Sequence, residues 1–205
     1  MNTPQSEKLG EALAKIHQSA SEFKSQFYRP VLSLEYLLDN SFAIIAPFLE
    51  HRQADLSYVS DLIPYIKNQL KHFPKKTPYW SVCWGDPHSG NAHFTESGEV
   101  TLFDFDQCGY GWRVFDFGKF LQVSLRTGIS KKVRDAFLTG YQSVYPLTED
   151  ELNVLQPMTQ MAQIWAWSIN INRYKVFNYS KIDDSYLTHR LEQLKRLKSK
   201  DWQLF

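Results

Sequence analysis

Hydrophobic residues recur at helical spacing over most of the first eighty residues. Three such segments follow one another, at Leu9 to His17, Leu32 to Leu49 and Leu56 to Phe73. Their apolar residues recur at steps of three and four, which is the period of one face of an α-helix. Ser6 marks the start of the first segment, and Pro64 is expected to interrupt or kink the third. We therefore predict three helices in this part of the chain.

The middle of the chain has the features of short strands. Trp80 to Cys83 begins an extended segment. Ala92 to Thr95 and Val100 to Phe103 then flank a four-residue segment, Glu96 to Glu99, that contains a glycine. This arrangement is typical of a β-hairpin. Because the helical period returns after Gly109 to Gly111, we predict a single small β element.

Helical spacing then persists to the end of the chain. The segments are Val114 to Leu121, Val133 to Tyr145, Leu152 to Phe177 and Tyr186 to Leu197. Pro157 is expected to bend the third of these or to mark its first turn. We predict an α+β fold that is mainly α, helical around a small central β-hairpin, in which residues 1–205 form one domain.

Composition narrows the classes of partner. Hydrophobic residues make up 43% of the chain and charged residues 22%, as in a soluble globular protein. The net charge of +1 gives no electrostatic reason to expect nucleic acid or an anionic membrane as a partner. No apolar stretch approaches the ~20 residues of a membrane span, and the N-terminus lacks the features of a signal peptide. We expect a cytoplasmic protein that binds neither nucleic acid nor membrane.

The two cysteines, Cys83 and Cys108, are too few for a disulfide framework. We expect them to be buried free thiols. The alternative is a metal site that combines them with His88 and His93, but no paired ligand spacing supports it.

Polar residues that suit phosphoryl transfer are concentrated between residues 82 and 118. Asp86 is followed, after four intervening residues, by Asn91, then by the predicted hairpin and by Asp104 at the end of an apolar strand. Transfer of a phosphoryl group needs an oriented nucleophile and a divalent metal on the phosphate oxygens. A carboxylate in a short loop suits the first task, and an amide beside a second carboxylate suits Mg²⁺. We expect the hairpin to bring Asn91 and Asp104 together.

Residues 85–91 taken alone are also typical of a surface turn, because Asp, Pro, Ser, Gly and Asn are all common there. The place of Asp104, directly after the hairpin, favours the phosphoryl-transfer interpretation. His88 in the loop and Asp106 beyond the second carboxylate are secondary candidates. Their alternatives are a loop hydrogen bond and a solvent-facing strand end.

The pattern resembles that of the aminoglycoside phosphotransferase and choline kinase-like small-molecule kinases. Their motif has an Asp, four residues, an Asn, a hairpin and an Asp between apolar residues. An aromatic-Asp-apolar signature follows, which residues 115–117 match. Residues 9–17 resemble the helix that opens the larger lobe of that family, and residues 102–118 are most similar to its homoserine kinase-like and stress-response kinase-like bacterial branch.

The resemblance implies a role for individual residues. Asp86 would be the catalytic base, Asn91 and Asp104 the Mg²⁺ ligands, and Asp116 a structural carboxylate that braces the catalytic loop. It also implies a protein kinase-like C-terminal lobe, ATP as phosphoryl donor, and a hydroxyl of a small molecule or of a protein Ser or Thr as acceptor. Residues 165–174 lie where related enzymes build the acceptor pocket, although an aromatic stripe at helical spacing is more often part of the core.

Two departures from the family pattern stand out. Trp84 occupies the place where the family usually has His. In addition, no Gly-rich phosphate loop and no strand Lys paired with a helix Glu precedes residue 80, although these parts hold the ATP phosphates in kinases. We therefore expect the N-terminal nucleotide lobe to be missing or supplied separately, and we assign no nucleotide-binding residue. The alternatives are a non-catalytic kinase-fold remnant or binding module, and a fragment of a longer kinase.

Overall fold

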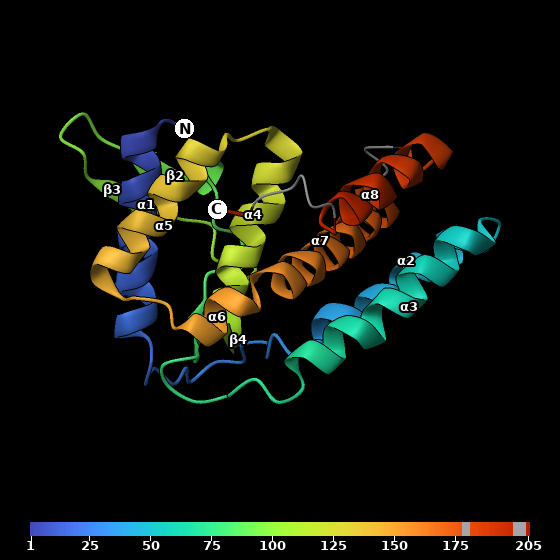
Figure 1. The fold of residues 1–205 in the computed structure, drawn as a ribbon, viewed down its shortest axis with the longest axis horizontal. Helices are drawn as coiled ribbons and strands as arrows, with labels where there is room; N and C mark the ends of the chain where they lie inside the picture. The colour runs from blue at the N-terminus through green and yellow to red at the C-terminus, as the bar shows by residue number, and fades with distance from the viewer. Residues whose placement is uncertain (178–180, 199–203) are drawn as a thin grey trace.

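The computed structural model describes residues 1–177, 181–198 and 204–205, and most of them lie in helices. Figure 1 shows α1 (Thr3–Ser19) beside α5 (Lys131–Val144) at one side of the molecule. The central helix α4 (Val114–Thr127) and the short strands lie next to this pair. The mainly helical character therefore agrees with the prediction.

The opposite side of the molecule is built on α7 (Leu155–Phe177), the longest helix. The helices α2 (Asn40–Leu49), α3 (Gln53–Leu70) and α8 (Asp184–Arg196) all contact it. α7 also packs against α4, so it joins the two sides of the molecule. None of the described helices combines the length and the apolarity of a membrane span.

The first helix begins earlier than Ser6, where we predicted its start. Asn2 accepts a hydrogen bond from the Gln5 N–H at 2.9 Å, and the Gln5 side chain accepts one from the Asn2 N–H at 3.1 Å. This reciprocal capping box satisfies two N–H groups that a helix end would otherwise leave without partners. Ser6 is instead buried, and its hydroxyl donates to the carbonyl of Val133 in α5 at 2.7 Å.

Two glycines allow α1 and α5 to pack with their backbones in close contact. A Cβ atom at Gly10 of α1 would overlap the carbonyl of Phe137, and one at Gly140 of α5 would overlap the carbonyl of Glu7. Glycine weakens a helix interior by roughly 1 kcal/mol relative to alanine. Both helices therefore carry a residue that weakens a helix at the place where they meet. We infer that glycine is present there because the close packing leaves no room for a Cβ atom.

The second helical segment starts with a π-helical turn, η1 (Glu35–Asp39), and continues as α2. In α3 the expected interruption at Pro64 does not occur, since the helix runs past it to Leu70. Leu62, Ile63 and Ile66 around the proline are buried. Their packing offsets the loss of one backbone hydrogen bond, which a proline in a helix interior always causes.

The strands form two separate antiparallel pairs. β2 (Ala92–Phe94) and β3 (Val100–Leu102) form the predicted hairpin, in which Ala92 faces Leu102. β1 (Trp80–Cys83) pairs with β4 (Gly109–Trp112), in the register that joins Trp80 to Trp112. The prediction of a single β element is therefore wrong, because β4 was not expected.

β4 escapes sequence-based prediction because two of its four residues are glycine, which has low strand propensity. The glycines are needed because the chain near Leu32 crosses this strand closely. A Cβ atom at Gly111 would lie 3.1 Å from that of Leu32, and one at Gly109 would lie 2.5 Å from the carbonyl oxygen of Pro30. Tertiary packing therefore decides the residue type here.

The predicted helix from Leu152 to Phe177 is divided in two. A short helix, α6 (Glu149–Asn153), begins with a capping box between Thr148 and Glu151 and ends before α7 starts. Pro157 lies in the first turn of α7, as predicted, where its missing N–H has no helical partner to lose.

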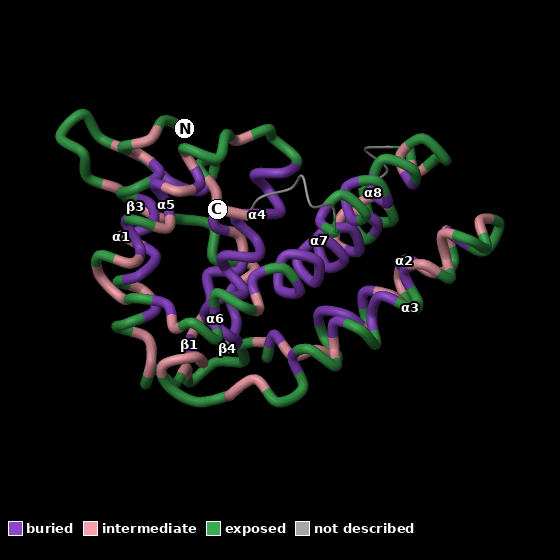
Figure 2. Tube along the Cα trace, viewed as in Figure 1, coloured by how far each residue is buried: buried purple, intermediate pink, exposed green. Residues whose placement is uncertain are grey.

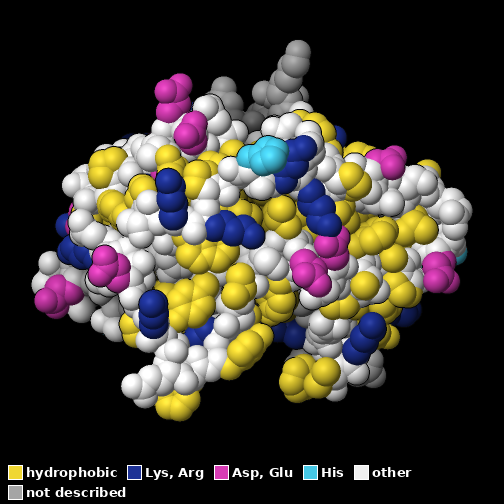
Figure 3. Space-filling view, turned by 90° about the horizontal axis from the view of Figure 1, so that it is seen from below, with side chains coloured by type: hydrophobic (Ala, Val, Ile, Leu, Met, Phe, Trp, Pro, Cys, Tyr) yellow, Lys and Arg dark blue, Asp and Glu magenta, His cyan; other side chains and the backbone are white. Residues whose placement is uncertain are grey.

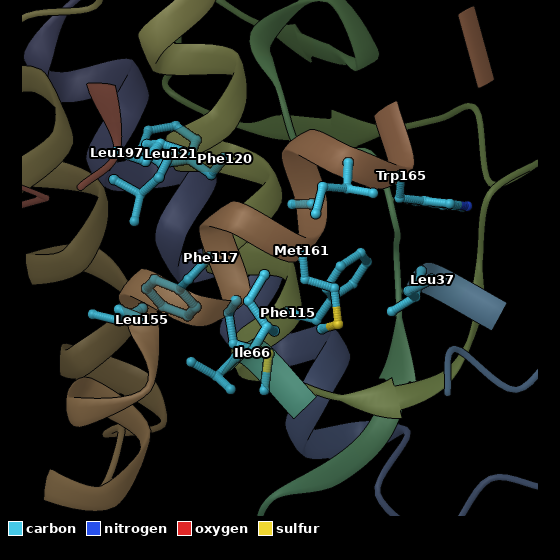
Figure 4. Packing of buried hydrophobic residues seen from close by; sticks show 14 of the residues in the cluster. Leu37, Ile66, Phe115, Phe117, Phe120, Leu121, Leu155, Met161, Trp165 and Leu197 are labelled. Atoms are coloured by element: carbon cyan, nitrogen blue, oxygen red, sulfur yellow. The ribbon is translucent and has the colours of Figure 1, made fainter. Parts of the chain in front are cut away.

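α4 is buried along most of its length and forms the centre of the core. Figure 2 shows it in purple between the two groups of helices, and every residue from Val114 to Leu125 is buried. Figure 4 shows its Phe115 near Met161 of α7, and the ring of Phe115 lies 5.7 Å from that of Trp165. Because α4 is held on all sides, the polar side chains that it carries have fixed positions.

Candidate active site

Asp86 lies in the loop that follows β1 and precedes a 3₁₀ turn, η2 (Ser89–Asn91). The loop turns sharply at Gly85, whose φ of +86° is in the region that favours glycine. A Cβ atom there would overlap the carbonyl of Gln107. The loop is therefore pressed against the segment that follows β3, and this contact decides where the Asp86 carboxylate lies.

The Asp86 carboxylate is in contact with four polar side chains. Lys119 lies 3.4 Å from Oδ1, and the Gln107 amide donates to Oδ2 at 3.1 Å. The Asn91 amide donates to the Asp86 carbonyl at 3.1 Å and lies 3.4 Å from Oδ2. His88 Nε2 lies 3.4 Å from the same oxygen. The side chain of Asp86 is 18% exposed, so it is held in place and still reachable.

These contacts keep the carboxylate charged. Burial by itself raises the pKa of Asp86, but the hydrogen bond from His88 and the charge of Lys119 outweigh burial and hold the pKa well below its usual range. His88 Nδ1 accepts a hydrogen bond from the Gly90 N–H at 3.0 Å, so Nε2 carries the proton that points to Asp86. Burial also lowers the pKa of Lys119, which is 3% exposed.

The hairpin places Asn91 and Asp104 at the same end of its two strands, as the sequence led us to expect. The Phe103 N–H donates to the Asn91 carbonyl at 3.1 Å, which puts Asp104 directly beyond this pair. Asn91 is 7% exposed, and its amide nitrogen is engaged by Asp86. Asp104 is exposed and has a φ of +58°, which is uncommon for a residue other than glycine. Its role as a metal ligand stays a prediction.

Trp84, the departure from the family pattern, anchors this end of the hairpin. It is fully buried, and its indole N–H donates to the carbonyls of Phe103 and Asp104, both at 3.1 Å. The bulky ring therefore packs under the strand end and hydrogen-bonds to the backbone of the candidate metal ligand.

Asp116 lies under the loop, in the first turn of α4. Its Oδ1 accepts from the Gly85 N–H at 2.8 Å, and its Oδ2 accepts from the Trp84 N–H at 2.7 Å. His17 Nε2 lies 2.9 Å from Oδ2, and His17 Nδ1 lies 2.8 Å from the Tyr141 hydroxyl. Helices α1, α4 and α5 are thus joined to the loop through one buried carboxylate.

His17, Cys83 and Asp116 are the only group of three described His, Cys or acidic residues whose ligand atoms lie within 4.8 Å of one another. Both nitrogens of His17 and both oxygens of Asp116 have hydrogen-bond partners, and the Cys83 thiol donates to the Trp112 carbonyl at 3.2 Å. We therefore interpret the group as a hydrogen-bonded network. Cys83 and Cys108 are buried free thiols, as predicted.

The other residues near Asp86 include both predicted and missed ones. His88 contacts the carboxylate, whereas Asp106 lines an adjoining hollow of about 300 Å³ beside Trp165, which shares Gln107 and Arg173 with the cavity at Asp86. Sequence reasoning missed Lys119 and Gln107. A signal for Lys119 did exist, because it stands three residues after Asp116 and therefore on the same face of α4.

A polar cavity of about 120 Å³ opens beside Asp86, between the loop and helices α4, α7 and α8. Asn170 and Arg173 of α7 line it, whereas Trp165 is 6% exposed and Trp167 is fully buried in the core. A larger hollow of about 650 Å³ lies between α1 and the hairpin. It does not include Asp86, so the smaller cavity is the one that belongs to the candidate site.

Comparison with known proteins relates the sequence to a family of enzymes. Residues 5–152 match the phosphotransferase enzyme family. An uncharacterized protein of Synechocystis sp. is 54% identical over 197 residues, which are 96% of this chain and 55% of the relative. A homoserine kinase of Polaromonas naphthalenivorans is 27% identical over 168 residues, which are 78% of this chain and 50% of the relative. The chain spans about half the length of the curated relatives that it matches.

Solved structures show the same fold. An amicoumacin kinase in complex with AMP-PNP and Ca²⁺ has a TM-score of 0.71 and 17% identity, over 96% of this chain and 59% of that one. A microcompartment-associated aminopropanol kinase has a TM-score of 0.69 and 17% identity, over 96% and 61%. A choline/ethanolamine kinase family protein of Mesorhizobium loti has a TM-score of 0.66 and 17% identity, over 96% and 63%. The fold is therefore protein kinase-like.

Proposed function

Because this chain belongs to the phosphotransferase enzyme family, we propose that it carries the catalytic half of an ATP- and Mg²⁺-dependent kinase for a small-molecule hydroxyl. The observation that carries the proposal is the state of Asp86, which is charged, fixed by four side chains and open to a polar cavity. A carboxylate so placed can orient a hydroxyl for attack on phosphorus.

Asp86 is proposed as the group that receives the acceptor's proton. Because its pKa is low, Asp86 is a weak base toward a free alcohol. Its main contribution is therefore to hold the hydroxyl in line, and it takes the proton only as the bond to phosphorus forms. Lys119 and His88 keep the carboxylate ionised until this proton transfer.

Asn91 and Asp104 are proposed to hold Mg²⁺, which when bound would neutralise charge on the phosphate oxygens. The residues fit this ion, since Mg²⁺ prefers a small number of carboxylate and carbonyl oxygens. The side-chain nitrogen of Asn91 donates to the backbone carbonyl of Asp86, so the side-chain oxygen of Asn91 points away from that carbonyl. Asp104 is exposed at the adjacent strand end.

Asp116 is proposed to brace the loop that carries Asp86, because its carboxylate accepts hydrogen bonds from the N–H groups of Trp84 and Gly85, the two residues before Asp86. It lies below the backbone and does not line the cavity. Asp116 therefore positions Asp86 by holding the backbone of its loop, and it does not contact a substrate directly.

A small molecule is favoured over a protein Ser or Thr as the acceptor. The cavity beside Asp86 has a volume of about 120 Å³ and is lined by the Asp86 loop and by helices α4, α7 and α8. The amicoumacin, aminopropanol and choline/ethanolamine kinases to which the fold is similar are named for small molecules. A protein segment would need a longer open groove for its flanking residues.

The nucleotide-binding residues are proposed to lie outside this chain, in a separate lobe. The segment between α1 and η1 carries three exposed aromatic side chains, Phe23, Phe27 and Tyr28, which are 56%, 78% and 87% exposed. In Figure 3, which shows the molecule from the lower side of Figure 1, hydrophobic side chains are spread over much of the surface. Exposed apolar surface of this kind is expected where another domain docks.

Loss of activity on substitution of Asp86 tests the proposal. The complete protein that contains this chain is incubated with Mg·ATP and a panel of small alcohols, and ADP release is measured. Asp86→Ala should lower the rate by about 10²-fold or more. Asp61→Asn, which changes an exposed carboxylate of α3, is the matched control. Full activity of Asp86→Ala would remove Asp86 as the base.

The same protein distinguishes the non-catalytic alternative. If the chain is a remnant or a binding module, the complete protein should show neither ADP release nor Mg²⁺-dependent binding of ATP. Micromolar binding of ATP that requires Mg²⁺ and is weakened by Asp104→Asn would contradict that alternative.

A further inference from the structure

We infer that the acceptor hydroxyl belongs to a small anionic compound, whose carboxylate or phosphate group enters the cavity beside Asp86. The inference rests on the proposed function and adds the chemical class of its acceptor. The cavity is lined by four basic side chains, Lys119, Arg126, Arg173 and Arg190, but by only one carboxylate, that of Asp86. Lys119 is paired with Asp86, whereas none of the three arginines forms an ion pair in the described part of the chain. Cations placed around one small space repel one another unless an anion lies between them.

Arg190 of α8 gives the sharpest indication of a missing anion. It is 9% exposed, yet its Nε atom has no hydrogen-bond partner among the described residues. Among the described side chains its one hydrogen-bond partner is Gln193, at a long 3.5 Å, and its guanidinium lies 5.1 Å from the ring of Tyr186. A buried guanidinium without a carboxylate is costly. Carboxylate and phosphate are the groups that its planar fork of donors matches.

Arg126 and Arg173 extend the positive surface at the mouth of the cavity. Both are exposed, and neither forms an ion pair with an acidic residue in the described part of the chain. Arg126 is close enough to Lys119 to contribute to the lowering of the pKa of that lysine, although burial is the main cause. Arg126 and Lys119 therefore repel each other, and an anion bound in the cavity that they share with Arg173 and Arg190 would relieve this repulsion.

The anion is assigned to the acceptor and not to the nucleotide because of where the cavity lies. Asp86 lines the cavity, whereas Asn91 and Asp104, the proposed metal ligands, do not. The cavity extends from Asp86 toward α7 and α8, through Asn170, Arg173 and Arg190. A compound with its hydroxyl at Asp86 would therefore present its other end to the arginines.

The volume limits the size of the group that fits. A space of about 120 Å³ corresponds to roughly four water molecules, each with about 30 Å³ of liquid volume. A carboxylate or phosphate with a short carbon chain has this size. A cationic acceptor would meet four like charges and only one carboxylate, which is unfavourable.

Binding without nucleotide tests the inference independently of catalysis. Titration calorimetry on the complete protein compares 4-hydroxybutanoate with 1,4-butanediol and 4-amino-1-butanol, which share its chain length and hydroxyl but are neutral and cationic. Inorganic phosphate serves as a bare anion. One charged hydrogen bond contributes about 1.5–3 kcal/mol, so the anionic compound or phosphate should bind at least 10-fold more tightly than the neutral and cationic compounds. Binding should also weaken as NaCl is raised.

Variants locate the site. Arg190→Gln should weaken binding of the anion at least 10-fold, whereas Lys132→Gln, on the exposed side of α5, should leave it unchanged. Arg190→Lys, which keeps the charge, should retain part of the affinity, and circular dichroism verifies that each variant is folded. The salt dependence of the unsubstituted protein provides evidence that needs no variant.

Three results would overturn the inference. The first is equal or tighter binding of the neutral or cationic compound. The second is the absence of Arg190-dependent binding of either anion at millimolar concentration. The third is competitive displacement of the anion by Mg·ATP, which would assign the cavity to the nucleotide phosphates. None of these results changes the expected effect of Asp86→Ala on ADP release, so the two proposals fail separately.

Discussion

Replacement of Asp116 by asparagine should destabilise the protein although the side chain keeps its size. The carboxylate accepts three hydrogen bonds, from the N–H groups of Trp84 and Gly85 and from His17. An asparagine side chain has one acceptor oxygen and one donor NH₂ group. Whichever way the amide turns, its NH₂ faces the N–H of Trp84 or of Gly85, which then has no acceptor.

The magnitude follows from this one lost acceptor. A buried donor without a partner costs about 1–3 kcal/mol, and Asp116 is fully buried. Unfolding in urea, followed by tryptophan fluorescence, gives the free energy of unfolding. With a denaturant slope of about 2.5 kcal/mol per M, the midpoint should fall by about 0.4–1.2 M. The matched control, Asp61→Asn on the exposed face of α3, should change stability by less than about 0.5 kcal/mol.

The same substitution should also affect catalysis, because the loop carries Asp86 in the position after Gly85. We expect kcat to fall more than KM rises, since the loop supplies the orienting carboxylate. An unfolding midpoint for Asp116→Asn equal to that of the unsubstituted protein would refute the bracing role. So would a kcat unaffected by a substitution that does lower stability.

Three further predictions concern other buried contacts. Glu151→Ala leaves the guanidinium of Arg113, bound through two contacts of 2.7 Å, buried without its carboxylate, so stability should fall by about 3–5 kcal/mol. For a chain of this size the melting temperature should fall by about 6–20 °C, against little change for Glu149→Ala on the exposed side of α6. The pKa of Asp86 is lowered in the folded state, so its stabilising contribution is present above the unfolded pKa of about 3.9 and is lost as the pH falls through and below it. Urea unfolding at several pH values compares the free energy of unfolding of the unsubstituted protein with that of Asp86→Asn. The difference should be constant above about pH 5, and the unsubstituted protein should lose stability relative to the variant below about pH 4. A relative gain in stability in that acidic range would show that the carboxylate is not held ionised. Gly140→Ala should lower the unfolding free energy by about 1–3 kcal/mol, because the new methyl group overlaps the backbone of α1; a gain in stability would show that the two helices separate at no cost.

Local patterns explain the part of the fold that could be predicted from the sequence. The hairpin depends on a turn whose strands are only five residues apart, and the 3.6-residue period marks each long helix. β4 depends instead on pairing with β1, across 25 intervening residues, and its glycines respond to the packing of Leu32. No short window of sequence contains that information.

Some residues of the candidate site could likewise be predicted from the sequence, and others could not. Asp86, Asn91 and Asp104 could be proposed from their spacing because one loop and one hairpin connect them. Arg190 reaches the same cavity from a helix more than a hundred residues later in the chain, so no spacing rule relates it to Asp86. Lys119 lies between these cases, since its spacing from Asp116 indicates a shared face but not that the face points to Asp86.

The contact between α1 and α5 has a consequence for how the protein is made. His17 of α1 and Tyr141 of α5 are separated by 124 residues, and the ribosome adds about 5–20 residues per second. For roughly 6–25 s after it leaves the ribosome, the first helix must therefore wait with its apolar face exposed. Contacts so distant in sequence also slow folding, because the entropy cost of closing a long loop precedes the stabilisation that the contact gives. The loop that carries Asp86, held through His17 and Asp116, should thus be among the last parts of the molecule to reach its final form.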